Sequence, residues 1–582
     1  MANEPSEGAT GSVGARRPLS TRTRWIIGIV AFIIVAPIVW LGIHAFIAYD
    51  ALINAEADVG SVQASISTNQ FSALPYIYDD MKSNTETAAA VTTDPVWLLS
   101  EHLPIVGPNL RAVRQVAQSV NGLVISGVGP IANEAKTFDF SDFRPKNGRI
   151  DVTKVEALLP VVDSAYRGVR SARISADAID TSHTLGPVTG AIANFRTLLG
   201  RAETEVENVR SIAQQIPPTL GSSGTRDYLV VLGTNADDRA NGGAAAALSL
   251  VSIDHGKLVI ERTEPASSIG AASALPTAGI PGAPPFADAA ATKSASVSDA
   301  ERSPVFPQSA ANIAAAWTAK FGGRVDAVVS IDTTGLGYLA GASGSVTVSD
   351  GKSIPAADLA SYLDVDQVAS ATPAALEEER TTALASVLGD VLDGSGTTAS
   401  YLSAANQLVR ERRVLLWSTD TKLQSFIDVT PVAGVLPADN SSTTAYGVYF
   451  NAADAAMTSP YLAAKIQLVP ALCTNASQTD SQLTLSLTST QPSGSLTEDI
   501  LVYGPAGFTA AGHTIAGATL VEANEATIAG RPVSLYRVRL QAGAQATLTL
   551  KHAVGGATPS SVAQVFTSPR HDLTSIGLAA CS

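Results

Sequence analysis

The 582-residue sequence is poor in cysteine, histidine and charged residues, and each shortage excludes a class of protein. It has two cysteines and seven histidines, with neither an H-E-x-x-H motif nor a Cys/His spacing that suits zinc. A metal site built on these residues is therefore not expected. The 38 basic and 52 acidic residues give a formal net charge of −14. Such an acidic chain argues against nucleic acid as a partner, and against docking on anionic lipid through a basic patch.

Motifs for familiar catalytic sites are also scarce. The sequence has no G-x-S-x-G elbow of the kind that carries a nucleophilic serine. Gly335, Gly337 and Ala340 fit the dinucleotide fingerprint G-x-G-x-x-A, but this match is weak in a chain so rich in alanine and glycine. We therefore predict no cofactor.

One long apolar run is present, from Trp25 to Ile47, and it contains no Asp, Glu, Lys or Arg. As a helix it is about 35 Å long, enough to cross a hydrocarbon core of about 30 Å. The charged residues that flank it are Arg16, Arg17, Arg22 and Arg24 before the run and Asp50, Glu56 and Asp58 after it. The positive-inside bias then places the N-terminus in the cytoplasm. A cleaved signal peptide is the alternative, but its apolar core is usually shorter. We predict a single-pass membrane protein with a cytoplasmic tail (1–24), a membrane helix (25–47) and an extracytoplasmic remainder.

The region from 50 to 217 has helical periodicity and almost no strand signal. Val155, Leu158, Leu159 and Val162 recur at three- and four-residue steps, the spacing of one helix face. Two prolines at 217 and 218 are expected to end the last helix. These features predict an extracytoplasmic helical stalk.

Beyond Pro218 the pattern changes to strands that alternate with helices. Short β-rich runs begin at 227, 246, 257 and 325, and helices are expected over 381–392 and 401–416. This alternation predicts an α/β domain over 225–440. Within it, residues 264–307 are rich in Ala, Ser, Pro and Gly, which predicts a long loop or lid. From 442 to 582, β-like runs between Gly and Pro turns predict an antiparallel β-sandwich. The fold class is therefore multidomain α+β.

The two cysteines, Cys473 and Cys581, both lie in the predicted sandwich. In an oxidising compartment they can pair. In the chain-entropy model a loop of about 108 residues contributes roughly 4–5 kcal/mol. Free thiols are the alternative, and we favour the disulfide.

A polar cluster follows the first predicted strand and supplies the main candidates for ligand binding. Its residues are Asn235, Asp237, Asp238, Arg239, Gly242 and Gly243. Open α/β sheets bind ligands at the carboxyl ends of their strands. Alternatively, this is a turn in which Asp238 pairs with Arg239 or with backbone N–H groups, and the glycines supply positive φ. Asp332 ends a later strand and is a further candidate, although capping of the next helix is its expected role.

Three stretches carry a family resemblance: DPVWLLSEHLPIVGPNLRAVR from Asp94, DYLVVLGTNADDRANGG from Asp227, and NAADAAMTSPYLAAKI from Asn451. Together they resemble the bacterial membrane-anchored family called domain of unknown function 4012. The chain departs from that pattern at Asp238, where glutamate is usual, and at Ala244, where an aromatic residue is usual. The family has no assigned biochemistry, so the resemblance implies architecture and a location in the plasma membrane of a bacterium.

A fainter resemblance suggests a chemistry. The order LGTNADDR, GG, LVSID and VDAVVSID is similar to that in the LytR-CpsA-Psr glycopolymer transferases. It implies an α/β pocket for polyprenyl pyrophosphate, with Asp on magnesium and Arg on the phosphates. However, the transferase stretch Arg-Ser-Asp-Thr aligns with four alanines, Ala244 to Ala247, and the later Arg-Asp pair falls near Arg262 and Glu264. We therefore expect the transferase shape without the activity.

The leading hypothesis is a non-enzymatic envelope protein that binds a cell-wall glycopolymer, a polyprenyl lipid carrier or an envelope protein. The alternative is a magnesium-dependent phosphotransferase acting on polyprenyl-pyrophosphate-linked glycans. In it Arg239 binds phosphate, and Asp237 or Asp238 binds the metal. A third possibility is an assembly scaffold in which the α/β pocket is vestigial.

Overall fold

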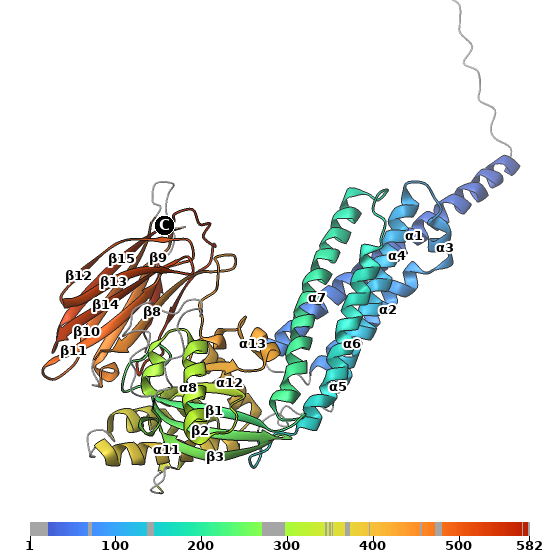
Figure 1. The fold of residues 1–582 in the computed structure, drawn as a ribbon. Coiled ribbons are helices and arrows are strands. Elements are labelled where there is room, and N and C mark those ends of the chain that lie inside the picture. Colours follow the sequence, from blue (N-terminus) through green and yellow to red (C-terminus); the bar gives the residue numbers. More distant parts are fainter. Residues whose placement is uncertain are drawn as a thin grey trace, which may run out of the picture. The chain divides into compact units, whose positions relative to one another are not determined.

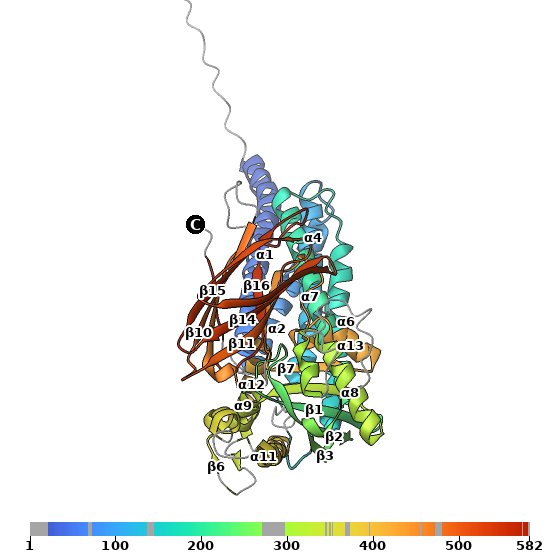
Figure 2. The same ribbon diagram turned by 60° about the vertical axis from the view of Figure 1, so that its left-hand side comes forward.

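The computed structural model describes residues 21–67, 73–136, 145–270, 297–343, 346–347, 351, 353–366, 373–394, 396–453, 457–471, 480–572 and 574–579. These residues form two compact units. One lies within Met1–Phe138 and Leu159–Ser211, and the other within Asp139–Leu158 and Ile212–Ser582. The first is helical, and the second contains the β-sheets (Figures 1 and 2). The predicted disulfide between Cys473 and Cys581 falls outside the described residues.

The helical unit packs through small side chains. Its elements are α1 (Thr21–Ser67), α2 (Leu74–Thr92), α3 (Pro95–Ser100), α4 (Val106–Leu123), the π-helical turn Val124–Val128, α5 (Gly129–Glu134), and most of α6 (Val152–Asp177) and α7 (Gly186–Thr219). Ala51, Ala88 and Ala117 form one buried cluster between three of these helices. A Cβ on Gly168 would lie 2.6 Å from the Cα of Gly127, so α6 approaches the π-helical turn at two glycines. The predicted helical character of this region is confirmed.

Helix α1 runs without a break through the predicted membrane run and into the bundle. In the described part of the chain, one helical stretch, Val35–Val62, is long and apolar enough to cross a membrane. The predicted anchor and the first helix of the bundle are thus one element. At the other end of the bundle, α7 ends at Thr219 and includes Pro217 and Pro218 in its last turn. Proline fixes a helical φ, so these residues continue the last turn although they donate no hydrogen bond.

The second unit contains a mixed five-stranded sheet in the order β3-β2-β1-β4-β7. The strands are β1 (Arg226–Thr234), β2 (Ala244–Asp254), β3 (Lys257–Pro265), β4 (Ala327–Asp332) and β7 (Val414–Ser418). Strands β1 and β4 are parallel, and the other pairs are antiparallel. The helices around the sheet are α8 (Phe306–Phe321), α9 (Thr333–Ser343), α10 (Leu359–Ser361), α11 (Pro373–Asp393), α12 (Thr398–Arg410) and α13 (Thr421–Ile427). A two-stranded sheet pairs β5 (Val346–Thr347) with β6 (Ser353–Ile354).

Helices cover both faces of the mixed sheet at its central strands, and β1 and β4 are accordingly mostly apolar and buried. Leu229 and Val231 of β1 pack in a core with α8. Val230 and Leu232, on the opposite face of the same strand, pack in a core with α9 and α11. Figure 1 shows α8 and α11 on opposite sides of β1, β2 and β3.

Two predictions in this region need correction. The helix predicted over 401–416 ends at Arg410, because Arg412 has a φ of 57° and Val414 pairs with Ile331 of β4. The loop predicted over 264–307 is packed at both described ends. Strand β3 continues to Pro265, and short 3₁₀ turns follow at Ala266–Ser268 and Val297–Arg302. Residues 271–296 lie outside the described part of the chain.

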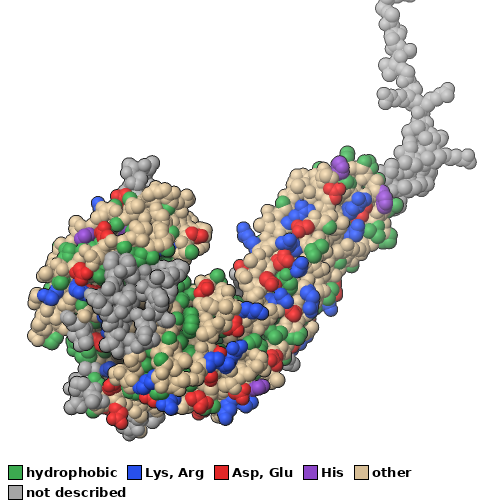
Figure 3. All heavy atoms as spheres, viewed as in Figure 1, with side chains coloured by type: hydrophobic (Ala, Val, Ile, Leu, Met, Phe, Trp, Pro, Cys, Tyr) green, Lys and Arg blue, Asp and Glu red, His purple; other side chains and the backbone are tan. Residues whose placement is uncertain are grey.

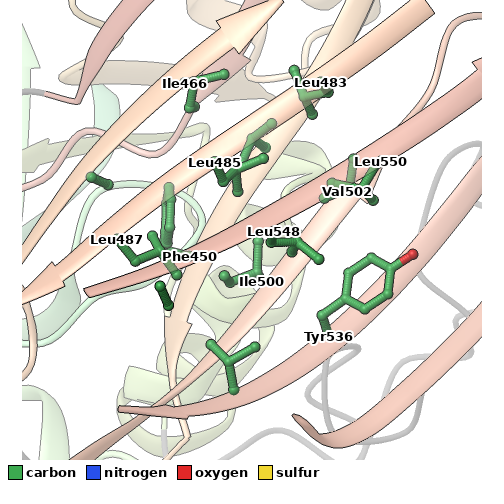
Figure 4. Close-up of a cluster of buried hydrophobic side chains, with 14 of the residues drawn as sticks. Phe450, Ile466, Leu483, Leu485, Leu487, Ile500, Val502, Tyr536, Leu548 and Leu550 are labelled. Atoms are coloured by element: carbon green, nitrogen blue, oxygen red, sulfur yellow. The ribbon is translucent and has the colours of Figure 1, made fainter. Parts of the chain in front are cut away.

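The C-terminal part of this unit is a sandwich of two five-stranded sheets, ordered β12-β15-β10-β9-β17 and β13-β14-β11-β8-β16. The strands are β8 (Thr444–Ala452), β9 (Leu462–Val469), β10 (Asp480–Ser489), β11 (Ser495–Tyr503), β12 (Thr509–Ala516), β13 (Thr519–Ile528), β14 (Arg531–Gln541), β15 (Gln545–Ala553), β16 (Ala563–Thr567) and β17 (Ser575–Leu578). Their inner faces share one core that includes Phe450, Leu485 and Ile500 (Figure 4). The sandwich is not purely antiparallel, because β16 and β17 run parallel to their neighbours β8 and β9.

The outer face of the second sheet packs on the α/β part of the same unit. Tyr449, Leu501 and Leu535 of the sandwich form a buried cluster with Ala240, which follows β1. The turn after β1 therefore lies at the junction between the mixed sheet and the sandwich.

Candidate functional site

The parallel pairing of β1 and β4 brings the candidate residues together. Gly233 near the end of β1 is level with Asp332 at the end of β4, so the turn that follows β1 and Asp332 share one edge of the sheet. The Nδ2 of Asn235 donates to Asp332 Oδ2 at 3.1 Å and to the carbonyl of Gly242 at 3.2 Å. The Oδ1 of Asn235 accepts from the hydroxyls of Thr333 and Thr334, each at 3.1 Å. Asn235 therefore holds the turn against the start of α9.

Asp332 caps α9 and forms a buried ion pair. Its Oδ1 accepts from the Gly335 N–H at 2.6 Å, so the structure shows the predicted capping role. Its Oδ2 accepts from Arg413 Nη1 at 2.7 Å, and both side chains are 1% exposed. Arg413 Nε also donates to Glu411 at 2.8 Å. Burial alone lowers the pKa of Arg413, but the charge of Asp332 and the hydrogen bond to Glu411 outweigh it and raise that pKa.

Asp238 forms a second buried ion pair, with Arg570 from the segment after β16. Arg570 Nε lies 3.0 Å from both carboxylate oxygens, and Nη2 lies 2.7 Å from Oδ2. Both side chains are 1% exposed. Arg239, the partner that the sequence offers for Asp238, donates from Nη1 to the Asp238 carbonyl at 2.8 Å. Arg413 Nη2 donates to the carbonyl of Arg570 at 3.0 Å, which links the two ion pairs.

The two glycines at the end of the turn have positive φ, 116° at Gly242 and 101° at Gly243. A Cβ on Gly243 would lie 2.1 Å from the Thr234 carbonyl oxygen, and one on Gly242 would lie 2.9 Å from Pro569. Glycine is therefore required here both for the backbone conformation and for the close approach.

Replacing Gly243 with alanine is expected to lower the free energy of unfolding by roughly 1–3 kcal/mol, from the strained φ together with the clash. Gly322→Ala is the matched control, because Gly322 has a φ of 73° with open space around its Cβ position. Denaturant unfolding of the two variants should give the larger loss for Gly243→Ala. Equal losses would mean that the clash at Thr234 contributes nothing.

A further group of polar contacts joins the two halves of this unit beside the ion pairs. Asn451 of β8 accepts from the Ala240 N–H at 3.1 Å and donates to the Arg302 carbonyl at 3.1 Å. Arg302 donates to the Ala452 carbonyl at 2.8 Å and to Asp499 at 3.2 Å. Arg537 completes the group, with Nε 2.7 Å from Asp499 Oδ1. The junction is therefore held by several charged and polar contacts.

Two fully buried carboxyl groups lie at the same junction. Burial raises the pKa of Glu301 to about 7, although hydrogen bonds from Asn241 and Ser330 oppose the shift. Burial and the nearby Asp238 raise the pKa of Glu498 well above its usual value. One oxygen of Glu301 and both oxygens of Glu498 have no hydrogen-bond partner. Glu301 is therefore held in the neutral form at mildly acidic pH, and burial favours the neutral form of Glu498 as well.

Asp237 and Arg380 keep unsatisfied polar atoms at the edge of the site. Asp237 Oδ1 and Arg380 Nη2 are buried and without a hydrogen-bond partner. Burial raises the pKa of Asp237, while the charges of Arg239 and Arg380 lower it. Burial lowers the pKa of Arg380, against the charges of Asp364 and Asp237. These couplings place the four charged residues Asp237, Arg239, Arg380 and Asp364 in one group.

Asp364 connects this group to both halves of the unit. It accepts from the hydroxyls of Thr234 and Thr333, each at 2.7 Å. His571 Nδ1 lies 3.5 Å from Asp364 Oδ2, and this carboxylate raises the pKa of His571. Sequence reasoning missed Asp364, Arg380, Arg413, Arg570 and His571. Each stands far along the chain from the turn after β1, and Arg380 follows three glutamates that predict a solvated helix start.

A shallow groove lies next to the site. It has a volume of about 380 Å³ and is lined mainly by small residues of α9 and α12 and of the turn before α10, including Gly337, Gly341, Ala356 and Ala404. Thr334, which bonds to Asn235, is at its border. In the described part of the chain, no group of three or more His, Cys, Asp and Glu residues is arranged to hold a metal ion.

Comparison with known proteins places the ion-paired carboxylates within a recognised family region. Residues 223–367 match the model of a family described as a protein of unknown function (DUF4012). No curated protein and no solved structure matches the chain. The matched range contains Asp238 and Asp332, whereas their partners Arg570 and Arg413 lie beyond it.

Proposed function

We propose that this chain is a membrane-anchored protein of the bacterial cell envelope that binds a cell-wall glycopolymer, a polyprenyl lipid carrier or another envelope protein, without catalysing a reaction. The observation that carries the proposal is that each carboxylate at the strand ends is occupied by an ion pair with a buried arginine. Asp332 is paired with Arg413 and Asp238 with Arg570. The edge of the sheet where α/β proteins place their ligands serves here as a joint to the sandwich.

The geometry at this edge argues against magnesium chemistry. Magnesium takes oxygen ligands and needs carboxylates that are free to coordinate it. Both oxygens of Asp238 accept from Arg570, and the oxygens of Asp332 accept from Gly335 and Arg413. Freeing either carboxylate leaves a buried charge unpaired, which costs about 3–5 kcal/mol. The start of β2 adds no ligand, because Ala244, Ala245 and Ala247 are buried alanines.

The same edge retains features that suit binding of a phosphate-bearing ligand. Arg380 has a buried N–H group without a partner, and guanidinium groups are well suited to phosphate. The small-residue groove bordered by Thr334 offers an apolar surface nearby. A polyprenyl carrier or an anionic wall polymer has this combination of chemistry. The third ligand that we propose, as an alternative to these two, is another protein of the envelope.

A specific observation favours the alternative, a magnesium-dependent phosphotransferase. Asp237 Oδ1 is buried and unpartnered, and the charges of Arg239 and Arg380 act on it. In this alternative Asp237 holds magnesium in place of Asp238, and Arg239 binds phosphate from a polyprenyl-pyrophosphate-linked glycan. Single carboxylates hold magnesium weakly unless substrate phosphates complete the shell.

The test uses the full chain in lipid nanodiscs with a polyprenyl-pyrophosphate-linked glycan and magnesium, and it measures binding and cleavage of the pyrophosphate bond together. We expect binding without cleavage, weakened at least tenfold by Arg380→Ala. Arg262→Ala is the matched control, because Arg262 is half exposed on β3. Cleavage that disappears in Arg239→Ala would establish the phosphotransferase and overturn the proposal. Absence of both binding and cleavage would exclude the lipid carrier and leave a bare polymer or a protein as the partner.

A further inference from the structure

The segment Pro95–Val106, which we call the interfacial loop, lies beside α1 at the level of Trp40. It comprises α3 and the turn that leads into α4. The indole Nε1 of Trp40 donates to Asp94 Oδ1 at 3.2 Å, and the same oxygen accepts from the Val96 N–H at 2.9 Å. Figure 1 shows α3 next to α1 at the end of the bundle from which α1 projects.

The interfacial loop exposes apolar side chains. Leu99 and Ile105 are each 75% exposed, and Leu98, Leu103 and Val106 are also exposed. Its one residue of fixed charge, Glu101, is buried and forms an ion pair with Arg114 at 2.6 Å. The exposed surface of the loop therefore carries no fixed charge. Figure 3 shows hydrophobic side chains, in green, at this end of the helical unit.

Contacts with α4 hold the loop in this exposed form. Trp97 is 1% exposed, and its indole N–H donates to the Leu110 carbonyl at 3.1 Å. Ile105 has a φ of 70°, which is rare for a β-branched residue and costs on the order of 1–3 kcal/mol. The Asn109 side chain fixes the Ile105 carbonyl at 2.7 Å. A strained backbone thus holds an isoleucine out of the bundle.

We propose that the interfacial loop inserts into the outer leaflet of the membrane that α1 crosses, so that the helical unit contacts the bilayer at two points. This inference rests on the proposed membrane anchoring. Along α1 from Val35 onward, where side chains are described, Val35, Ile38 and Phe46 are exposed and Ala48 is the first fully buried residue. The bundle therefore packs on α1 from the end of the apolar run. Trp40 lies about 23 Å along the helix from Trp25, within the outer part of a core of about 30 Å. Apolar side chains at that level lie in the depth range of interfacial segments, about 5–10 Å.

The experiment uses the full chain in nanodiscs, with Cys473→Ser and Cys581→Ser removing the native thiols. Single cysteines at Leu99→Cys and Ile105→Cys carry a bimane label, and quenching by lipids with a shallow doxyl group is measured. The control is Val209→Cys, which is 53% exposed on α7. Val209 lies about 35 Å along that helix from its start. We expect quenching at positions 99 and 105 to exceed quenching at 209 at least threefold.

A label at Ile38→Cys separates this inference from the anchoring itself, because Ile38 is 62% exposed on α1. Quenching at 38 without quenching at 99 and 105 overturns the loop insertion alone, and absence of quenching at 38 overturns the anchoring. Aqueous iodide distinguishes the remaining outcomes. Labels at 99 and 105 that iodide reaches as readily as the label at 209 indicate a solvated loop. Labels shielded from both lipid and iodide indicate a protein partner or a second copy. Either result contradicts the proposal.

Discussion

Replacing Arg570 with alanine is expected to lower the free energy of unfolding of the sheet-containing unit by about 3–5 kcal/mol, because it leaves a buried carboxylate without its partner. Asp238 and Arg570 are both 1% exposed and share three hydrogen bonds. Glu498, another buried carboxyl group near this pair, cannot replace the positive charge of Arg570. Denaturant unfolding followed by tryptophan fluorescence measures the loss, since Trp317 and Trp417 lie in this unit.

Two controls determine whether the charge or the packing is responsible. The double variant Asp238→Leu with Arg570→Met removes both charges and keeps apolar volume, so it should recover most of the stability. The pair Arg262 and Glu264, at 3.1 Å but with Arg262 52% exposed, is the matched surface pair, and Arg262→Ala should cost less than about 1 kcal/mol. A loss of under 1 kcal/mol for Arg570→Ala would show that the joint does not depend on this ion pair.

The two carboxylates of the site could be predicted from the sequence, but their arginine partners could not. The run DYLVVLG predicts β1 because it is mostly apolar and includes two β-branched valines, and VDAVVSID predicts β4 in the same way. Strand ends in an α/β pattern direct attention to Asp238 and Asp332. Their partners could not be found, because Arg570 is 332 residues from Asp238 and lies in another predicted domain. The residues next to an arginine in the sequence do not indicate that it will be buried against a distant carboxylate.

The errors in the strands and loops have similar causes. Val414 to Leu416 extend the apolar pattern of the helix before them, and the positive φ of Arg412 that separates the two elements has no sequence signal. The parallel pairing of β16 with β8 and of β17 with β9 depends on long connections, which periodicity does not predict. In the low-complexity segment, Val297 and Phe306 are buried in the core between α8 and the sheet, although Ser296 and Ser298 flank Val297.

The stability of the sheet-containing unit is expected to fall as the pH rises from about 5 to about 7, and Glu301 accounts for part of this loss. The folded state holds the pKa of Glu301 at about 7, above its ordinary value of 4.5. The unfolded chain therefore loses the proton first, and the folded state becomes less favourable as the pH rises between these two values. The shift in the pKa of Glu301 corresponds to a decrease in the free energy of unfolding on the order of 3 kcal/mol. This decrease is complete above pH 7. His571, whose pKa is raised by Asp364, changes stability in the same direction.

Glu301→Gln isolates the contribution of Glu301, because glutamine has the shape of the neutral acid and does not titrate. The variant should match the wild type at pH 5 and exceed it above pH 7, as measured by denaturant unfolding at each pH. His552 provides a contrast. Burial lowers its pKa to about 4, so its effect is a loss of stability as the pH falls below 6.5, and it is common to both proteins. If the two proteins keep a constant difference from pH 5 to pH 8, Glu301 is ionised in the folded state. The junction between the mixed sheet and the sandwich would then hold a charged carboxylate that the surrounding residues stabilise.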